Sequence, residues 1–381
     1  MKYRSLGRCV LSIGEIGLGC EGLLGKPESV VHEFLDVMEA HGANGIDLYS
    51  PNPQMRTALG RAMRGRRDRF VLEAHLCTVW KDGQYKRTRS MDEVRSGFDD
   101  QLARLGTDHV EIGMIHYVDS LDDWRGVSDG GVLRYALELR DSGVARAVGL
   151  SSHNPQVALT AVESGAIDVL LFSVNPCYDL QPADEDVEQL WNREKYQGEL
   201  LNMDPERQAL YETCQRLGVG ITVMKAFGGG DLLRADRSLA GVALTPFQCL
   251  AYALDRPGVA SVFAGAHSVE ELRLGLAYAD APESERDYAA ALASFPRMSW
   301  KGHCMYCGHC APCPSGIDVA AVTKLLNLAL AQESVPETVR EHYAALEHGA
   351  GECVRCGSCE DRCPFDVAAV ANMARAAEMF E

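Results

Sequence analysis

Eight cysteines in the last fifth of the chain have spacings that are typical of iron–sulfur ligands. They form two runs of the type Cys-x-x-Cys-x-x-Cys, and each run ends in a Cys-Pro pair, at residues 304–314 and 353–364. Such a turn supplies three thiolates to one [4Fe–4S] cube, and the cysteine before proline supplies the fourth thiolate to the other cube. We therefore predict two [4Fe–4S] clusters. The predicted ligands are Cys304, Cys307, Cys310 and Cys363 for one cluster, and Cys353, Cys356, Cys359 and Cys313 for the other.

Structural zinc is the alternative for these cysteines. Tetrahedral zinc sites rarely use two four-cysteine runs that each end in Cys-Pro, so the pattern favours iron–sulfur. The first run is one residue shorter than the second before its last cysteine. Residues 318–346 between the runs have an apolar stripe at helical spacing, as in the α-helical kind of two-cluster ferredoxin. Paired clusters generally pass single electrons over a distance, and a purely structural role is the other interpretation.

A second set of polar residues stands at the ends of predicted strands. Asp47 and Tyr49 share one face of a strand over 46–49, because side chains alternate along a strand. His75 ends a strand over 70–75, and His116 ends a strand over 110–116. Two histidines with an aspartate and a tyrosine at neighbouring strand ends favour an acid–base site. Asp47, His75 and His116 also match a two-histidine, one-carboxylate metal set, so a metal ion in this place is an alternative.

The elements that must position these residues repeat along the first three quarters of the chain. A helical stretch, a glycine and a short apolar run recur around residues 42, 106, 143, 165, 218 and 258. Two further strands, over 16–20 and 70–75, bring the number to eight. We predict a (β/α)₈ TIM barrel over 1–295, followed by a small α-helical ferredoxin-like domain over 296–381. An open doubly wound sheet is the alternative.

Chemistry in such barrels takes place at the carboxyl ends of the strands, so the loops that follow them are candidate ligand sites. The loop over 76–90 contains four cations that hint at an anionic ligand, although such residues usually form a solvated face. They are Lys81, Lys86, Arg87 and Arg89. A long acidic loop over 178–204 could cover a substrate. Lys225, Gly228 and Gly229 follow the seventh strand, where bare backbone could approach phosphate oxygens.

Composition limits the possible partners. The 381 residues carry a formal net charge of −17, which argues against nucleic acid, because phosphate backbones select basic surfaces. The chain has neither an apolar run long enough for a membrane span nor a secretion signal at its start, so we expect a cytoplasmic protein. Fourteen cysteines are many for a reducing compartment, where spaced cysteines are more often ligands than disulfides.

Several short motifs together resemble the aldo-keto reductases over nearly the whole barrel. They are Tyr3-Arg-Ser-Leu-Gly7, Gly17-Leu-Gly19, Asp47 after the second strand, His116 in Met-Ile-His, and Gly149-Leu-Ser-Ser152. The cysteine runs are similar to those of the branch with a C-terminal ferredoxin domain. The resemblance implies a barrel that binds a nicotinamide nucleotide without a Rossmann fold and passes hydride to a carbonyl. It also implies a tetrad of Asp, Tyr, Lys and His, whose tyrosine protonates the carbonyl oxygen.

This sequence departs from the tetrad at two places. Asp47 and His116 match the family pattern, but residues 50–53 replace the tyrosine position and His75 replaces the lysine. Tyr49, two residues earlier, or His116 would then act as the acid.

The resemblance also places a nucleotide site. Ser151 and Ser152 fall where the family has Ser and Asn for the carboxamide, and Leu171 falls where it often has Gln. Glu271 stands where an arginine often binds the 2′-phosphate, which favours NAD over NADP. The predicted cofactor-binding residues are Ser151, Ser152, Lys225, Gly228, Gly229, Gly265, His267 and Glu271.

These observations predict an iron–sulfur oxidoreductase that acts on a small, carbonyl-type substrate at the barrel mouth. Asp47, Tyr49, His75 and His116 would handle protons, and the clusters would relay electrons, with a ferredoxin as a possible redox partner. One alternative is a ferredoxin-fed reductase that uses no hydride and reduces an activated double bond or expels a leaving group. The other alternative is a non-catalytic electron-transfer subunit.

Overall fold

The computed structural model describes residues 1–196, 200–295, 298–332 and 334–381. Eight parallel strands close into a barrel, with each strand hydrogen-bonded to the next and the last one to the first. The predicted TIM barrel is therefore confirmed, and the open-sheet alternative is wrong. The barrel strands are β3 (Ile16–Gly19), β4 (Gly45–Leu48), β5 (Val71–Leu76), β8 (Val110–Ile115), β9 (Ala145–Ser152), β10 (Val169–Ser173), β12 (Gly220–Met224) and β13 (Val259–Gly265).

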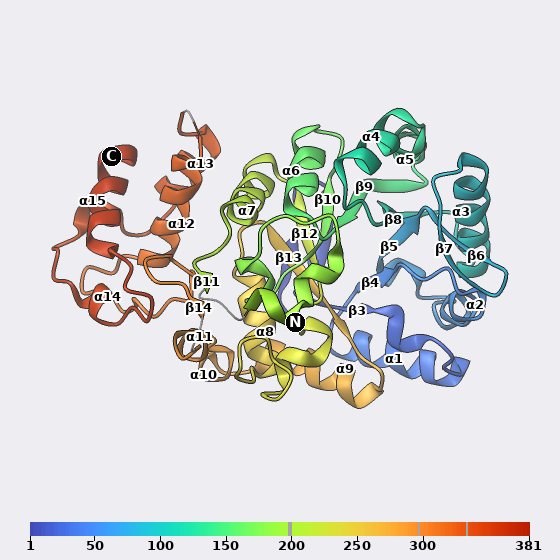
Figure 1. The fold of residues 1–381 in the computed structure, drawn as a ribbon, viewed down its shortest axis with the longest axis horizontal. Helices are drawn as coiled ribbons and strands as arrows, with labels where there is room; N and C mark the ends of the chain where they lie inside the picture. The colour runs from blue at the N-terminus through green and yellow to red at the C-terminus, as the bar shows by residue number, and fades with distance from the viewer. Residues whose placement is uncertain (197–199, 296–297, 333) are drawn as a thin grey trace.

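Helices surround the barrel and pack their apolar stripes against it (Figure 1). In α1, for example, Val31, Phe34, Leu35 and Met38 are all buried. The helices of this layer are α1 (Glu28–Ala40), α2 (Pro53–Ala62), α3 (Met91–Leu105), α4 (Leu121–Asp129), α5 (Val132–Asp141), α6 (Pro155–Glu163), α7 (Pro205–Leu217), α8 (Pro246–Leu254) and α9 (Val269–Leu276). This packing leaves the loops at the carboxyl ends of the strands to form the mouth of the barrel.

Two hairpins lie outside the barrel strands. β1 (Tyr3–Ser5) and β2 (Ser12–Gly14) pair at the amino-terminal end. Leu6, next to β1, and Ile13, within β2, are buried against side chains of the barrel strands. β6 (Thr78–Lys81) and β7 (Gln84–Arg87) form a hairpin in the segment that follows β5. Its turn residues, Asp82 and Gly83, both have positive φ, as a two-residue type I′ turn requires. The predicted loop over 76–90 is thus largely an ordered hairpin.

Short elements complete the barrel region. The 3₁₀ helices are η1 (Cys20–Leu23), η2 (Arg67–Arg69), η3 (Tyr178–Leu180), η4 (Val187–Trp191), η5 (Arg193–Tyr196), η6 (Gly228–Leu233), η7 (Ala277–Asp280) and, further along the chain, η8 (Ala350–Glu352). Two short helices, α10 (Glu283–Arg286) and α11 (Ala289–Ala293), lead toward the C-terminal part. β11 (Leu200–Leu201) and β14 (Met298–Ser299) form a short parallel pair.

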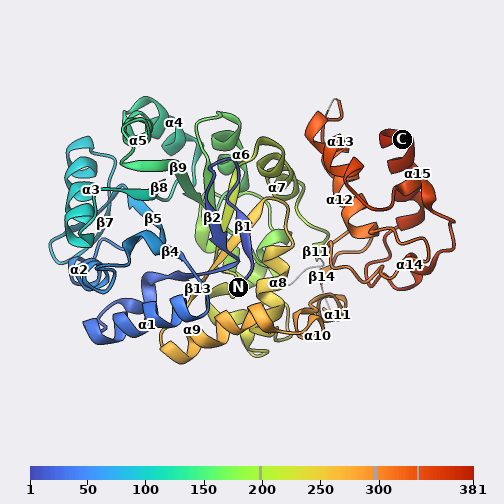
Figure 2. The same cartoon turned by 180° about the vertical axis from the view of Figure 1, so that it is seen from behind.

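The C-terminal part is helical and stands beside the barrel (Figures 1 and 2). Its helices are α12 (Val319–Leu330), α13 (Glu337–Ala344), α14 (Ser358–Asp361) and α15 (Ala369–Phe380). Val322, Leu326, Met373 and Ala376 belong to a hydrophobic core separate from that of the barrel. The predicted domain boundary between 295 and 296 falls at residues 296–297, which lie outside the described residues. No helix in the described part of the chain is long and apolar enough to cross a membrane.

Candidate functional site

The two cysteine runs share a backbone feature around their second cysteine. Tyr306 and Arg355, which precede the second cysteine of each run, both have positive φ. Gly308 and Gly357, which follow that cysteine, also have positive φ. Successive residues of alternating handedness turn backbone N–H groups into a concavity that suits an anion or an iron–sulfur cluster. The two loops are therefore shaped for the same kind of ligand.

Each loop opens on its own cavity, and cysteines of both runs line each cavity. One cavity is lined by Cys304, Cys307, Cys310, Cys359 and Cys363. The other is lined by Cys313, Cys353, Cys356 and Cys359. The cysteine before each proline thus faces the cavity of the other run, and Cys359 borders both cavities.

The chemistry of these cavities fits [4Fe–4S] clusters. All fourteen cysteines are free thiols. Burial raises the pKa of Cys310 to about 11, so this thiol would not ionise without a nearby cation. Among the residues that the structure describes, no three His, Cys, Asp or Glu side chains converge on a single ion. Four sulfurs spread around a cavity suit a cube better than one tetrahedral ion.

The two cavities differ in their surroundings. Cys304, Cys307 and Cys363 pack against the hydrophobic core of the barrel. The buried Arg256 and Tyr288, from the barrel part of the chain, both donate hydrogen bonds to the carbonyl oxygen of Met305 in the first run. In the second run, Cys356 is exposed. The first cavity therefore adjoins the barrel, and the second lies nearer the outer surface.

At the barrel mouth, four side chains form one continuous hydrogen-bonded chain, which we call the relay: Asp47, His75, His116 and Tyr85. Oδ1 of Asp47 lies 2.8 Å from Nε2 of His75. Nδ1 of His75 lies 2.7 Å from Nδ1 of His116, and Nε2 of His116 lies 2.9 Å from the Tyr85 hydroxyl. Three members come from the ends of adjacent strands β4, β5 and β8, and Tyr85 comes from the β6–β7 hairpin.

The chemistry of these groups limits where the protons of the relay can lie. A carboxylate only accepts hydrogen bonds, so Nε2 of His75 carries a proton toward Asp47. Burial, reinforced by the charge of His75, holds the pKa of His116 well below its usual value, so His116 is neutral. A neutral His116 then has one proton, which lies either on Nδ1 toward His75 or on Nε2 toward Tyr85. The relay can therefore move a proton between its two ends.

Tyr49 lies beside the relay but not within it. Its ring stacks on His116, with centroids 6.1 Å apart. Burial, together with the nearby Glu21, raises the pKa of Tyr49. The hydroxyl that ends the relay belongs to Tyr85, which the sequence analysis did not select. The Asp82-Gly83 pair was the signal for a hairpin that could have located it.

The cations of the hairpin have internal partners. Lys81 and Lys86 pair with Glu93, and Arg89 pairs with Asp123. Arg87 and Arg89 both donate to the carbonyl oxygen of Tyr117. These contacts anchor the hairpin that carries Tyr85, so the cations do not form the free anion-binding cluster that the sequence hinted at.

The metal alternative at the barrel mouth does not fit the structure. Both ring nitrogens of His75 and both ring nitrogens of His116 take part in hydrogen bonds of the relay. Neither imidazole therefore has a nitrogen left for a metal ion.

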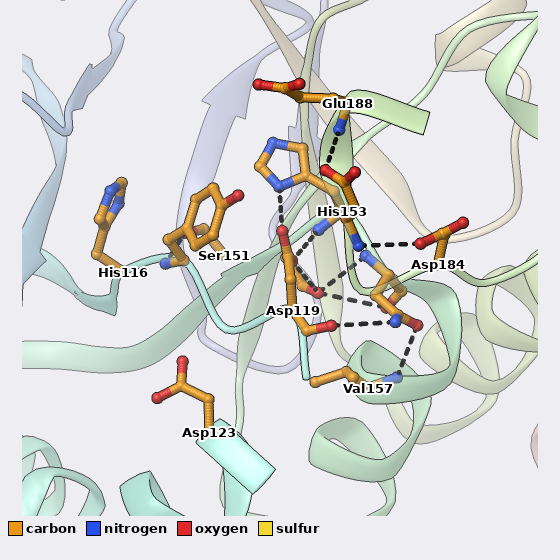
Figure 3. Close-up of polar contacts among 12 residues, drawn as sticks. His116, Asp119, Asp123, Ser151, His153, Val157, Asp184 and Glu188 are labelled. Carbon is orange, nitrogen blue, oxygen red and sulfur yellow. Dashed lines mark hydrogen bonds and ion pairs between the residues drawn. The ribbon is translucent and has the colours of Figure 1, made fainter. Parts of the chain in front are cut away.

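A second acid–base pair lies at the same end of the barrel. Nδ1 of His153 lies 2.8 Å from Oδ2 of Asp119, and both side chains are buried (Figure 3). Oδ1 of Asp119 accepts hydrogen bonds from the Ser152 hydroxyl and the His153 backbone N–H. Burial alone would raise the pKa of Asp119, but the hydrogen bonds that its carboxylate accepts from His153 and Ser152 outweigh burial, and the pKa lies below its usual value. Asp119 is thus an ionised carboxylate that orients His153.

Some of the predicted cofactor-binding residues border open space, and others already contact groups of the protein. A Cβ atom at Gly229 or Gly265 would meet nothing within 4 Å, so the backbone there borders open space that a nucleotide could occupy. Lys225 stands over the Trp191 ring, and burial lowers its pKa to about 8. Gly228, by contrast, lies against Leu232.

The serines and Glu271 are engaged within the protein. Ser152 donates to Asp119, and the Ser151 hydroxyl accepts from the Tyr117 N–H. The Glu271 carboxylate accepts from the backbone N–H of His267 at the start of α9.

Comparisons with known proteins agree with the fold and the cluster motifs. The aldo/keto reductase family model matches residues 15–243, and a 4Fe-4S dicluster domain model matches residues 303–368. An uncharacterized oxidoreductase of Bacillus subtilis, YqkF, is 27% identical over 80% of this chain and 99% of its own length. The aldo-keto reductase YhdN of the same organism is 24% identical over 47% of this chain and 54% of its own. Among solved structures, the aldo-keto reductase AKR11C1 of Bacillus halodurans has a TM-score of 0.59 and 23% identity, covering 75% of this chain and 94% of its own.

Proposed function

Because this chain belongs to the aldo/keto reductase family and has a 4Fe-4S dicluster domain, we propose that it interconverts a small carbonyl compound and its alcohol at the barrel mouth, with electrons relayed through two [4Fe–4S] clusters. The observation that carries this proposal is the relay, which ends on the Tyr85 hydroxyl at the mouth. The cavity of the first cysteine run adjoins the barrel, which supports electron exchange between the two parts. We place the domain boundary near residue 295, and the protein in the reducing cytoplasm.

The relay supplies the proton that the carbonyl oxygen takes up. The hydrogen that joins the carbon arrives as a hydride when a nicotinamide nucleotide is bound, and as a second proton from solvent when the clusters alone supply the two electrons. In the loaded state, His75 is an imidazolium beside the Asp47 carboxylate, His116 donates from Nε2 to Tyr85, and the Tyr85 hydroxyl faces the substrate. Tyr85 protonates the carbonyl oxygen and takes a proton from His116, which takes one from His75. His116 is neutral before and after the transfer, as its lowered pKa requires.

The electrons come from groups that the chain would bind. The eight cysteines would hold clusters that exchange single electrons, and a nicotinamide nucleotide near Ser151, Lys225 and Gly229 would supply a hydride when bound. A small partner such as a ferredoxin would exchange electrons with the more exposed second cluster, next to Cys356.

An anaerobic titration tests this proposal. The purified protein is titrated with NADH and then NADPH, while visible and EPR spectra are recorded. Saturable binding of NADH, with bleaching of the cluster absorbance, is expected. The nicotinamide part of the proposal would be overturned if dithionite reduced the clusters but neither nucleotide bound to the protein or bleached the cluster absorbance.

A ferredoxin-fed reduction without nicotinamide is the second candidate. One observation favours it: the Ser152 hydroxyl, at a position that the family uses for the carboxamide, donates to the buried Asp119 instead. If this second candidate is correct, dithionite-reduced protein should reduce an activated alkene without any nucleotide.

Glu271 is expected to govern the choice between NADH and NADPH. Its carboxylate accepts a hydrogen bond from the backbone N–H of His267. Glu271→Arg should therefore remove a charge that repels a 2′-phosphate and add one that attracts it. The ratio of the Kd for NADPH to that for NADH should fall by about tenfold or more, which corresponds to about 1.4 kcal/mol. Glu270→Arg, at the neighbouring position in α9, is the matched control. An equal change in both variants would contradict the assignment.

Lys225 should make nucleotide binding depend on pH. Because burial lowers its pKa to about 8, the ammonium loses its charge as the pH rises through that value. The Kd for NADH, measured by fluorescence titration, should therefore increase above about pH 8 and stay nearly constant below it. Lys225→Met should bind more weakly at neutral pH and show little pH dependence in this range. A wild-type Kd that is constant from pH 7 to 9.5 would exclude Lys225 as a phosphate ligand.

A further inference from the structure

The proposed carbonyl reduction uses neither residue of the buried pair formed by Asp119 and His153. Asp119 lies in the loop after β8, and His153 lies directly after β9, so both stand at the carboxyl ends of barrel strands. Figure 3 shows the His153 imidazole directed at the Asp119 carboxylate. Asn154 also donates from its side chain to the Asp119 backbone carbonyl, which fixes the loop to the strand end. Both residues are therefore held in one defined orientation.

The hydrogen bond to Asp119 determines which nitrogen of His153 is reactive. Asp119 accepts the Nδ1 proton, so in a neutral imidazole Nε2 carries the lone pair. Within the described part of the chain, no side chain or backbone group hydrogen-bonds to that Nε2. A carboxylate-oriented imidazole with a free Nε2 is the arrangement of a general base.

The surroundings keep this base unprotonated. Burial lowers the pKa of His153, and although Asp119 acts in the opposite direction, the positive charges of Lys225 and Arg207 add to the lowering. At neutral pH the imidazole is therefore ready to accept a proton.

His153 and the relay flank the same aromatic ring. The centroid of the Tyr117 ring lies 5.3 Å from that of His153 and 6.0 Å from that of His116. Tyr117 has a φ of 53°, a conformation that non-glycine residues rarely adopt. The Ser151 hydroxyl accepts a hydrogen bond from the Tyr117 N–H, and the Arg87 guanidinium lies over the Tyr117 ring. The Tyr117 ring thus lies next to both the His153 imidazole and the His116 imidazole of the relay.

We propose that His153, oriented by Asp119, is a catalytic base that removes a proton from the carbon next to the substrate carbonyl, so that the barrel mouth enolises its substrate. The proposal rests on the proposed function, because it takes the carbonyl oxygen to be placed at Tyr85. The substrate class is then narrower: ketones and aldehydes that have a hydrogen on the α-carbon.

The step conserves protons and electrons without an added reagent. Nε2 of His153 takes the α-proton, and the C–H electron pair becomes the carbon–carbon double bond. The π pair of the carbonyl moves to oxygen, which takes the Tyr85 proton. His116 returns a proton to Tyr85 and takes one from His75, so His116 stays neutral. When His153 gains the proton, its positive charge lowers the pKa of His116. This change favours transfer of a proton from His116 to Tyr85. Reversal in D₂O places a deuteron on carbon.

The test uses the purified holoprotein in D₂O, without nucleotide or reductant. Acetone, cyclohexanone and hydroxyacetone are the probes, and loss of their α-proton signals is followed by ¹H NMR. Reduction of the same compounds and of benzaldehyde, which has no α-hydrogen, is measured in parallel with NADH or with dithionite-reduced protein. We expect exchange of at least one ketone, reduced about a hundredfold or more in His153→Gln and in Asp119→Asn. His32→Gln, a change in the exposed part of α1, is the matched control.

The outcomes separate the two proposals. In His153→Gln the α-exchange should fall by a far larger factor than benzaldehyde reduction, because that reduction needs no α-proton, and the cluster spectrum should be retained. The assignment of His153 as the base would be wrong if the wild type reduced carbonyls without any α-exchange, or if exchange survived in His153→Gln. Either result would leave the proposed function intact. Exchange without any reduction would support the base and overturn the proposed function. Absence of both activities with every probe would overturn both.

Discussion

Replacing Tyr85 with phenylalanine should lower kcat for carbonyl reduction by about 10²–10⁴-fold, the usual contribution of a positioned general acid. The substitution removes only the hydroxyl that lies 2.9 Å from Nε2 of His116. Because Tyr85 is on a hairpin anchored by ion pairs of Lys81, Lys86 and Arg89, the fold should be unaffected. The measurement is steady-state reduction of a carbonyl substrate, with visible and EPR spectra to show that the clusters are intact.

Tyr49→Phe is the matched control, since the Tyr49 ring also contacts His116 but its hydroxyl is outside the relay. We expect its kcat to stay within a few-fold of the wild type. The reverse pattern, with a large loss in Tyr49→Phe and little change in Tyr85→Phe, would assign the acid to Tyr49 and exclude the relay as described.

Each Cys-Pro cysteine should serve the cluster of the other run, and double variants would reveal this. Cys356→Ala should lose the second cluster and retain about four of about eight irons, since each cube has four. Adding Cys363→Ala to that variant should remove the remaining cluster, because Cys363 lines the first cavity. Adding Cys313→Ala should cost no further iron, because Cys313 lines the cavity that is already disrupted.

Iron and sulfide analysis, with EPR of the dithionite-reduced protein, provides the readout. If Cys313→Ala removed the last cluster and Cys363→Ala did not, each run would be a self-contained ligand set. A protein with bound zinc and no EPR signal after reduction would exclude the clusters altogether.

The barrel and the cluster cysteines could be predicted because their signals are local. Glycines such as Gly106 and Gly218 end helices in the left-handed conformation and are followed by apolar strands, so this pattern marks six of the eight strands. Cysteine spacing within each run depends on a single turn of backbone. The cross-pairing of Cys313 and Cys363 follows from the known geometry of such runs rather than from any local pattern.

The barrel site was only partly predictable, because its contacts join segments that are distant in the sequence. Asp47, His75 and His116 end adjacent strands, so parallel-barrel geometry alone brings them together. Tyr85 reaches His116 only because the Asp82-Gly83 turn folds the hairpin back over the mouth. Asp119 and His153 lie 34 residues apart, in loops of different strands, and no spacing rule pairs them.

A single-turnover experiment tests most directly whether cluster electrons and the relay serve one reaction. Protein reduced with dithionite and freed of excess reductant is mixed anaerobically with a carbonyl substrate identified in the probe panel, and cluster reoxidation is followed at visible wavelengths. We expect reoxidation with one alcohol formed per two electrons, and much slower reoxidation in Tyr85→Phe than in Tyr49→Phe. Clusters that stay reduced, while NADH still converts the same compound, would contradict the proposal that they exchange electrons with the barrel site.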